Sequence, residues 1–89
     1  MTMRRVKIEN IKGLHARASA KLVELVEGFD AEAIISKDGE SASGDSIMGL
    51  LMLAASIGTF IDVQTSGPEA EALAQAIEDL VADKFGEGN

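Results

Sequence analysis

Two spacings of apolar residues alternate along this chain, and their order constrains the fold more than any other feature. Residues 5–9 alternate apolar and charged side chains, which is typical of a strand with one buried face. Between residues 18 and 29 the apolar side chains recur every three or four positions, as on one face of a helix. By the same criteria we expect strands at 31–37, 40–43 and 59–65 and helices at 47–55 and 70–81. The predicted order is β-α-β-β-α-β-α.

This order is typical of an α+β domain in which helices cover a four-stranded sheet. Two helices must lie over one face of the sheet, and the last helix completes that layer. The pattern does not fix the order of the strands, and a ferredoxin-like sheet would give much the same pattern. Because the chain has 89 residues, of which 46% are hydrophobic, we expect one domain with one core over residues 1–89.

Composition excludes several classes of function. The chain has no cysteine and a single histidine, so neither a disulfide framework nor a thiolate or histidine-rich metal site can form. We therefore expect no metal and no cofactor. No apolar run approaches the ~20 residues that span a bilayer, and the first residues lack the hydrophobic region of a signal peptide. We expect a cytoplasmic protein with no membrane contact.

The charges are unevenly distributed along the sequence. The formal net charge of −7 argues against nucleic acid as the main partner. Residues 1–21 nevertheless hold six basic residues and one acid, Glu9, for a net charge of +5, and the remaining residues carry −12. The one histidine, His15, lies in the basic segment, where a bound anion is best tolerated.

The segment Gly13-Leu14-His15-Ala16-Arg17 lies where the first predicted helix begins. The N–H groups of a first helical turn lack internal partners, and the helix dipole is positive there. That environment favours neutral imidazole, the nucleophilic form, and its N–H groups can bind a phosphoryl group once it is attached. Arg17 adds a forked donor that suits phosphate. The alternative is that His15 only caps the helix or fills a loop, and residue chemistry alone leaves the two interpretations about even.

A second helix start lies at Gly44-Asp45-Ser46, which precedes an apolar run. Ser46 is a typical N-cap residue, and that structural role would suffice to explain it. A phosphate on the Ser46 hydroxyl would also face a helix N-terminus and be stabilised there. Both roles are compatible.

The run from Ile47 to Leu53 is more apolar than one buried helix face requires. Leu50 and Leu53 can point to the core together, whereas Ile47, Met48 and Leu51 cannot all follow them. We expect some of these side chains to form an exposed apolar patch that binds a protein partner. The alternative is that a small helical layer buries them all.

Over essentially its whole length, the sequence resembles the HPr family of histidine-containing phosphocarriers of the phosphoenolpyruvate-dependent phosphotransferase system. The resemblance rests on residues 13–17 and on Gly44-Asp45-Ser46-Ile47-Met48-Gly49-Leu50. The stretches 28–32, 50–53 and 65–69 are closer to the nitrogen-type branch, NPr. The resemblance implies an open-faced β-sandwich, with an antiparallel four-stranded sheet in the order 1-4-2-3 and three helices on one face.

The resemblance also implies a carrier rather than a stand-alone enzyme. Phosphorylated enzyme I would phosphorylate Nδ1 of His15, and the group would pass to an enzyme IIA protein. The Arg17 side chain and the backbone of Ala16 and Arg17 would contact the phosphoryl group. Ser46 matches the serine that HPr kinase/phosphorylase phosphorylates, which slows phosphorylation of His15. The residues that match the partner-binding surface are Leu14, Ile47, Met48 and Leu51, and the expected oligomeric state is a monomer.

The chain departs from the family pattern in the first predicted helix. Ala18 stands where the family usually has proline, which would pre-set the first helical turn. We expect a slightly looser helix start and no loss of function. Ala20, Glu24 and Glu27 stand where sugar-branch members tend to carry lysines, which favours a specialised enzyme I.

Two other functions fit parts of the sequence. The chain could be a regulatory binding module that responds to Ser46 phosphorylation, with little flux through His15. Arg17 and its basic surroundings weigh against this alternative, because a vestigial histidine would not need them. A ferredoxin-like domain that binds a small molecule would need a pocket, and three aromatic residues offer little to line one.

Overall fold

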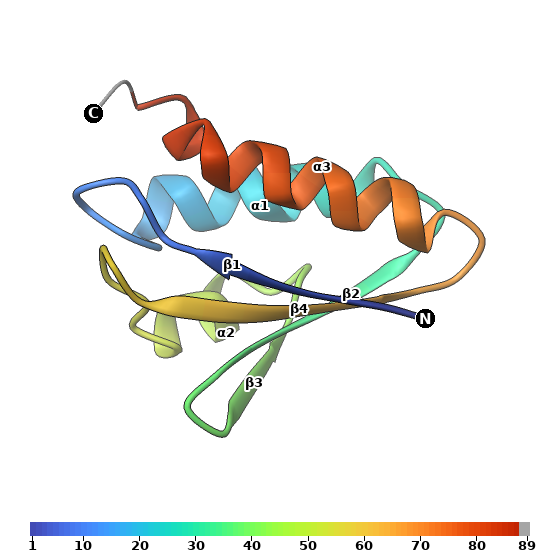
Figure 1. Cartoon of the computed structure of the whole chain (residues 1–89), viewed down its shortest axis with the longest axis horizontal. Helices are drawn as coiled ribbons and strands as arrows, with labels where there is room; N and C mark the ends of the chain where they lie inside the picture. The colour runs from blue at the N-terminus through green and yellow to red at the C-terminus, as the bar shows by residue number, and fades with distance from the viewer. Residues whose placement is uncertain (88–89) are drawn as a thin grey trace.

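The computed structural model, which describes residues 1–87, contains four strands and three helices in the predicted order (Figure 1). A single 3-10 turn, η1 (Lys84–Gly86), follows the last helix. The other elements are β1 (Thr2–Lys7), α1 (Ala16–Glu27), β2 (Glu32–Lys37), β3 (Glu40–Ser43), α2 (Ile47–Met52), β4 (Phe60–Ser66) and α3 (Ala70–Ala82).

Two elements differ from their predicted bounds by three residues at one end, and the others differ by no more than two. β1 begins three residues earlier than expected and ends at Lys7, while Ile8 is fully buried just beyond it. Ile8 instead pairs with the turn before β4, donating to the Thr59 carbonyl and accepting from the Gly58 N–H, both at 2.8 Å. α2 was expected to reach residue 55 but ends at Met52, because Ala54 adopts a left-handed φ of +53° that no helix can continue through.

The four strands form one antiparallel sheet in the order β1-β4-β2-β3. This is the order that the family resemblance implied and that the element pattern alone left open. In the register, Val6 lies opposite Ile61, and Ile35 lies opposite both Val63 and Ala42. Because these apolar residues share one face of the sheet, a slip by one residue would expose all of them, so burial specifies the register.

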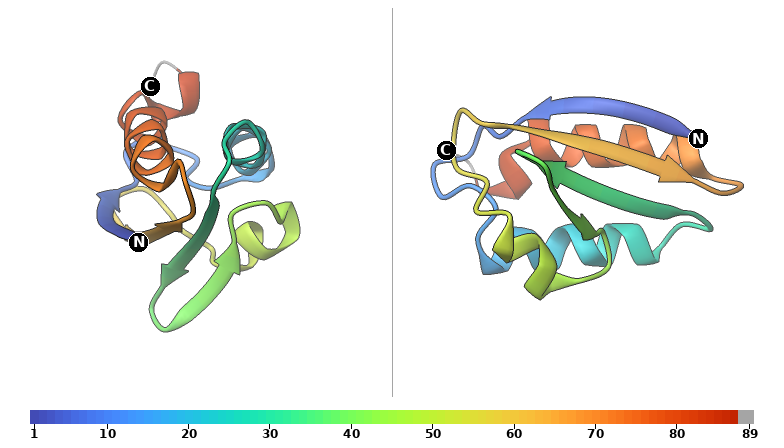
Figure 2. Two further views of the ribbon diagram at one scale, coloured as in Figure 1. Left: turned by 90° about the vertical axis from the view of Figure 1, so that its right-hand side faces the viewer. Right: turned by 90° about the horizontal axis from the view of Figure 1, so that it is seen from below.

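All three helices lie on the same face of the sheet (Figure 2). The other face is open to solvent, and Arg5 lies there with its guanidinium 5.2 Å from the Phe60 ring centroid. A single layer of apolar side chains fills the space between helices and sheet. Its fully buried members include Ile8, Leu22, Ile35, Leu50, Ile61, Val63, Leu73, Ile77, Val81 and Phe85. The architecture is therefore the α+β open-faced sandwich.

Candidate functional site

His15 occupies the N-cap position of α1, with extended backbone angles (φ −80°, ψ −176°). Its side chain is 26% exposed and makes no capping hydrogen bond to the helix backbone. The first intrahelical hydrogen bond runs from the Ser19 N–H to the His15 carbonyl at 2.8 Å. The N–H groups of Ala16, Arg17 and Ala18 precede it, so they have no partner within the helix.

Gly13 fixes the loop that delivers His15 to the helix start. Its φ is +64°, and a Cβ at this position would lie 2.4 Å from the Ala55 carbonyl oxygen and 2.9 Å from the Ser56 Cα. The next residue, Leu14, donates its N–H to that same carbonyl at 2.8 Å. Only glycine allows the two loops to approach this closely. The glycine of the Gly-Leu-His segment thus has a steric reason for its identity.

The imidazole is paired with an acid from the other end of the chain. His15 Nε2 contacts Glu87 Oε2, and the Glu87 side chain is only 10% exposed. The second oxygen, Oε1, accepts a hydrogen bond from Asn10 Nδ2 at 3.0 Å. The bond from His15, and next that from Asn10, hold the pKa of the Glu87 carboxyl below its usual value, and the Lys12 charge adds to this. Glu87 is therefore ionised at neutral pH.

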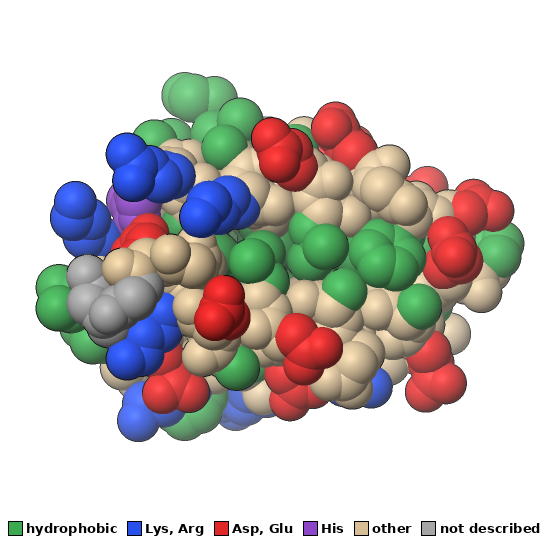
Figure 3. Space-filling view, turned by 90° about the horizontal axis from the view of Figure 1, so that it is seen from above, with side chains coloured by type: hydrophobic (Ala, Val, Ile, Leu, Met, Phe, Trp, Pro, Cys, Tyr) green, Lys and Arg blue, Asp and Glu red, His purple; other side chains and the backbone are tan. Residues whose placement is uncertain are grey.

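Three basic side chains surround the pair. Lys12, Arg17 and Lys21 line a shallow hollow of about 230 Å³ together with His15, Gly86 and Glu87. Arg17 is exposed and makes no hydrogen bond or ion pair with residues 1–87. In Figure 3 basic side chains gather at the end of the molecule that carries the histidine, whereas most of the charged side chains over the rest of that face are acidic. Because three cations and one ionised acid line the hollow, its net charge is positive and favours an anion.

Sequence reasoning missed Glu87 and Asn10. Glu87 was counted only as one of many acids, and nothing in its local sequence indicates that a residue 72 positions away touches His15. A weak signal was available in Phe85 and Gly86, because a large apolar residue followed by glycine after a helix predicts a packed turn. Asn10 carried no signal beyond its place in the loop before the Gly-Leu-His segment.

Ser46 lies at the N-cap of α2. Its Oγ accepts a hydrogen bond from the Gly49 N–H at 3.1 Å, and the residue is half-buried. The neighbouring Asp45 is exposed and accepts a hydrogen bond from the Ser43 hydroxyl at 2.5 Å. The structure therefore places Ser46 in the capping role and leaves its second predicted role, as a phosphorylation site, to a functional test.

The expected apolar patch is only partly as anticipated. Met48 is 72% exposed, Ile47 is also exposed and Leu51 is half-buried. Met52, which was not singled out, is 75% exposed and extends the same surface of α2. Leu14 is a correction: its side chain is 4% exposed and belongs to the core, so it has almost no surface to offer a partner.

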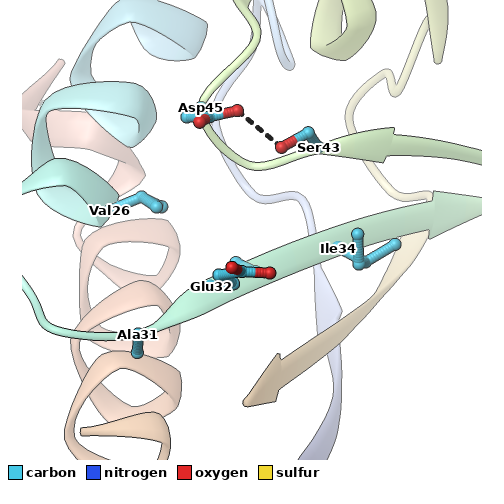
Figure 4. Close-up of a pocket in the computed structure, with 7 residues that line it drawn as sticks. Val26, Ala31, Glu32, Ile34, Ser43 and Asp45 are labelled. Atoms are coloured by element: carbon cyan, nitrogen blue, oxygen red, sulfur yellow. Dashed lines mark hydrogen bonds between the residues drawn. The ribbon is translucent and has the colours of Figure 1, made fainter. Parts of the chain in front are cut away.

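A second hollow lies away from His15 and holds no histidine or basic side chain. A hollow of about 260 Å³ is lined by α1, β2 and the turn after β3, and Figure 4 shows Ser43 and Asp45 on one side of it and Glu32 on another. Within residues 1–87, no three acidic or histidine side chains come together as a metal site would require. None of the helices in that range has the length and hydropathy needed to traverse a bilayer.

Comparison with known proteins agrees with this arrangement. Residues 2–83 match the family model described as the PTS HPr component phosphorylation site. The phosphocarrier protein HPr of Cupriavidus necator is 43% identical over 88 residues, which cover 99% of each chain. The phosphocarrier protein NPr of Escherichia coli is 47% identical over 74 residues, which cover 81% of this chain and 82% of that one. The crystal structure of HPr-C-His from Thermoanaerobacter tengcongensis superposes with a TM-score of 0.93 at 33% identity, covering 98% of each chain.

An open-faced sandwich with one histidine at an uncapped helix start defines a small phosphoryl-carrier domain. The family match covers nearly the whole chain, and the relatives are identical at more than two positions in five. The chain belongs to the HPr phosphocarrier family of the phosphotransferase system. Proteins named HPr and NPr both match, so the assignment to the nitrogen-type branch stays a prediction.

Proposed function

We propose that His15 accepts a phosphoryl group from phosphorylated enzyme I on Nδ1 and passes it to an enzyme IIA protein. The observation that carries this proposal is the uncapped start of α1, where His15 stands beside three N–H groups without intrahelical partners. Phosphoryl transfer needs mainly positioning and charge neutralisation, and this site can supply both without a metal.

Arg17 and the amides of Ala16 and Arg17 would stabilise the attached group. The guanidinium is permanently charged, and no partner within residues 1–87 engages it. Backbone N–H groups at a helix start bind anionic oxygens at a fixed angle. Because a carrier must also release its cargo, modest stabilisation serves it better than tight binding: each ~1.4 kcal/mol would shift the exchange tenfold.

The partner-binding surface would consist of Ile47, Met48 and Leu51, extended by Met52. Exposed methionines adapt to partners of different shape, and an apolar patch of this kind on a small domain marks a protein contact. We place the protein in the cytoplasm as a monomer, with enzyme I, an IIA protein and HPr kinase/phosphorylase as successive partners. The acidic Glu24 and Glu27 of α1 favour a specialised enzyme I.

Labelling with phosphoenolpyruvate and the cognate enzyme I tests the acceptor. The wild-type protein should acquire a phosphate that is labile in acid and stable in base, as a phosphoramidate is. His15→Ala should abolish the label because it removes the nucleophile, while Ser46→Ala should retain it. Equal labelling of the His15→Ala protein would reject His15 as the acceptor.

Prior phosphorylation with ATP and the kinase tests the role of Ser46. A phosphate on Ser46 adds up to two negative charges beside α2, and we expect slower labelling of His15 afterwards. The Ser46→Ala protein should show no change after the same treatment. Unchanged His15 labelling in fully Ser46-phosphorylated protein would remove the regulatory proposal and leave the carrier proposal intact.

A further inference from the structure

We propose that Glu87, held in place by Asn10, keeps the proton of the His15 ring on Nε2 and so presents the lone pair of Nδ1 to the incoming phosphoryl group. Glu87 is then a positioning residue that acts through His15. This inference rests on the proposed function of His15 as phosphoryl acceptor, and it explains which ring nitrogen reacts.

The contacts of Glu87 leave only one assignment of the ring proton. The lowered pKa of Glu87 makes it a carboxylate at neutral pH, and a carboxylate can only accept hydrogen bonds. Nε2 of His15 must therefore be the donor in its contact with Oε2. In a neutral imidazole the other nitrogen then carries the lone pair, and no residue within 1–87 donates a hydrogen bond to Nδ1.

Asn10 fixes the carboxylate and the loop before His15 with a single amide group. Its Nδ2 donates to Glu87 Oε1 at 3.0 Å and to the Gly13 carbonyl at 2.8 Å. Both partners are acceptors, so the amide nitrogen and not the oxygen must face them. The Asn10 side chain is fully buried, which leaves it little freedom to rotate. The acid and the loop that carries His15 are thus tied to the same group.

The turn that precedes Glu87 is held in place by burial and by a hydrogen bond. Phe85 is fully buried in the core, and its carbonyl accepts a hydrogen bond from Lys21 Nζ at 2.6 Å. Lys84 and Phe85 have φ values of +56° and +55°, which non-glycine residues adopt only at an energetic cost. Non-glycine residues hold such a conformation only where the surrounding contacts stabilise it. Glu87 follows this turn directly and is placed by it.

The chemistry of the transfer benefits from this arrangement. The Nδ1 lone pair forms the new N–P bond, while the bond between phosphorus and the donor breaks and its electron pair stays on the donor. The ring keeps the Nε2 proton and becomes positively charged, so no proton has to move during the step. The Glu87 carboxylate offsets that charge, as the acid of a catalytic triad does for its histidine. Lys12, Arg17 and Lys21 offset the repulsion between Glu87 and the phosphoryl oxygens.

Nuclear magnetic resonance of the full chain labelled with ¹⁵N at the ring gives the first measurement. In the wild-type protein we expect a ring N–H proton bonded to Nε2 that exchanges slowly enough to be observed near neutral pH. In Glu87→Ala this resonance should disappear into solvent exchange. Asn10→Ala should broaden it, because the carboxylate loses its second anchor. Glu78→Ala is the matched control, since it removes an acid of the same charge that pairs with Arg4 elsewhere.

The rate of phosphoryl transfer from phosphorylated enzyme I gives the second measurement. We expect Glu87→Ala to lower kcat by about tenfold with KM changed by less than about twofold, because the carboxylate acts on the reacting ring and not on docking. Glu78→Ala should transfer at the wild-type rate. Glu87→Gln keeps an acceptor for the Nε2 proton but loses the charge, so it should retain the ring resonance and transfer at an intermediate rate.

An unchanged transfer rate in Glu87→Ala overturns the proposal, and so does a ring N–H resonance that survives that substitution. A faster rate would also overturn it, because the carboxylate would then obstruct the incoming anion. These failures differ from failure of the carrier function. If His15→Ala were labelled like the wild type, the acceptor assignment itself would be wrong, whatever Glu87 does.

Discussion

The starts of α1 and α2 both have an extended N-cap residue, but only the start of α2 has a side chain that caps its free N–H groups. His15 and Ser46 are both N-cap residues in extended conformation. The Ser46 hydroxyl accepts a hydrogen bond from the Gly49 N–H and closes its own helix start. The His15 side chain turns away from its helix to Glu87 and leaves the first N–H groups of α1 open. The first arrangement stabilises the fold, and the second leaves donors for a ligand.

The start of α1 has basic neighbours, whereas the start of α2 has an acidic one. Lys12 and Arg17 flank His15, so an anion is attracted there. Asp45 directly precedes Ser46, so a phosphate added to the hydroxyl would meet a negative neighbour. A helix N-terminus therefore does not define an anion site by itself. What distinguishes α1 is the combination of an unused cap, basic neighbours and a histidine at the N-cap.

The largest effect is expected where the α1 start is anchored. Gly13→Ala should lower the free energy of unfolding by about 3 kcal/mol, because it combines a strained left-handed φ with a clash against backbone. Urea denaturation monitored by circular dichroism measures this. Gly39→Ala is the matched control: its φ of +85° is equally unfavourable, but nothing lies within 4 Å of the added Cβ. The control should lose only about 1 kcal/mol. Equal losses in both proteins would show that the two loops do not approach as described.

A smaller effect is expected at the start of α2. Ser46→Ala removes the hydroxyl that accepts from the Gly49 N–H and should cost about 1 kcal/mol of stability. Ser46→Thr retains a capping oxygen and should stay within about 0.5 kcal/mol of the wild type. Thermal and urea unfolding of the three proteins compares them directly. If Ser46→Ala were as stable as the wild type, the contrast between a closed and an open helix start would fail.

Much of the fold could be predicted because apolar spacing reports burial directly. The order of elements followed from periods of two and of three to four residues, and it is the observed order. The end of α2 could not be predicted this way. Residues 53–55 are apolar and form helices well, so they read as a continuation of the helix. In the structure Leu53 and Ala55 are buried outside the helix, because Ala54 between them has a positive φ. Apolar residues that are buried in an irregular segment show no helical or strand spacing, so the sequence alone does not reveal their conformation.

In the candidate site, too, residues with a local sequence signal could be predicted and the others could not. His15 and Arg17 were predicted because they adjoin a helix start, which is a local signal. Glu87 and Asn10 were missed because their contacts join residues far apart in sequence, and hydrogen-bond partners of that kind leave no periodic trace. Leu14 was misjudged for a related reason. The family resemblance placed it on the partner-binding surface, but its side chain packs into the core while its N–H donates to the Ala55 carbonyl.

The smallest effect is expected from Glu87, the acid that pairs with His15, and it depends on pH. The pKa of Glu87 is lowered in the folded protein, mainly by its bond with His15. The pairing therefore stabilises the folded state fully above the ordinary carboxyl value of 4.5, and this contribution is lost as pH falls through the lowered value. Glu87→Gln cannot titrate, so the stability difference between wild type and variant should shrink as the pH falls below about 4.5. Urea unfolding of both proteins between about pH 2.5 and 7 measures this difference, with Glu71→Gln as a control for loss of the same charge from an exposed helix face. A difference that grows as the pH falls below about 4.5 would mean that Glu87 is not ionised in the folded protein, and the ring would then lack the negative charge that holds the proton on Nε2.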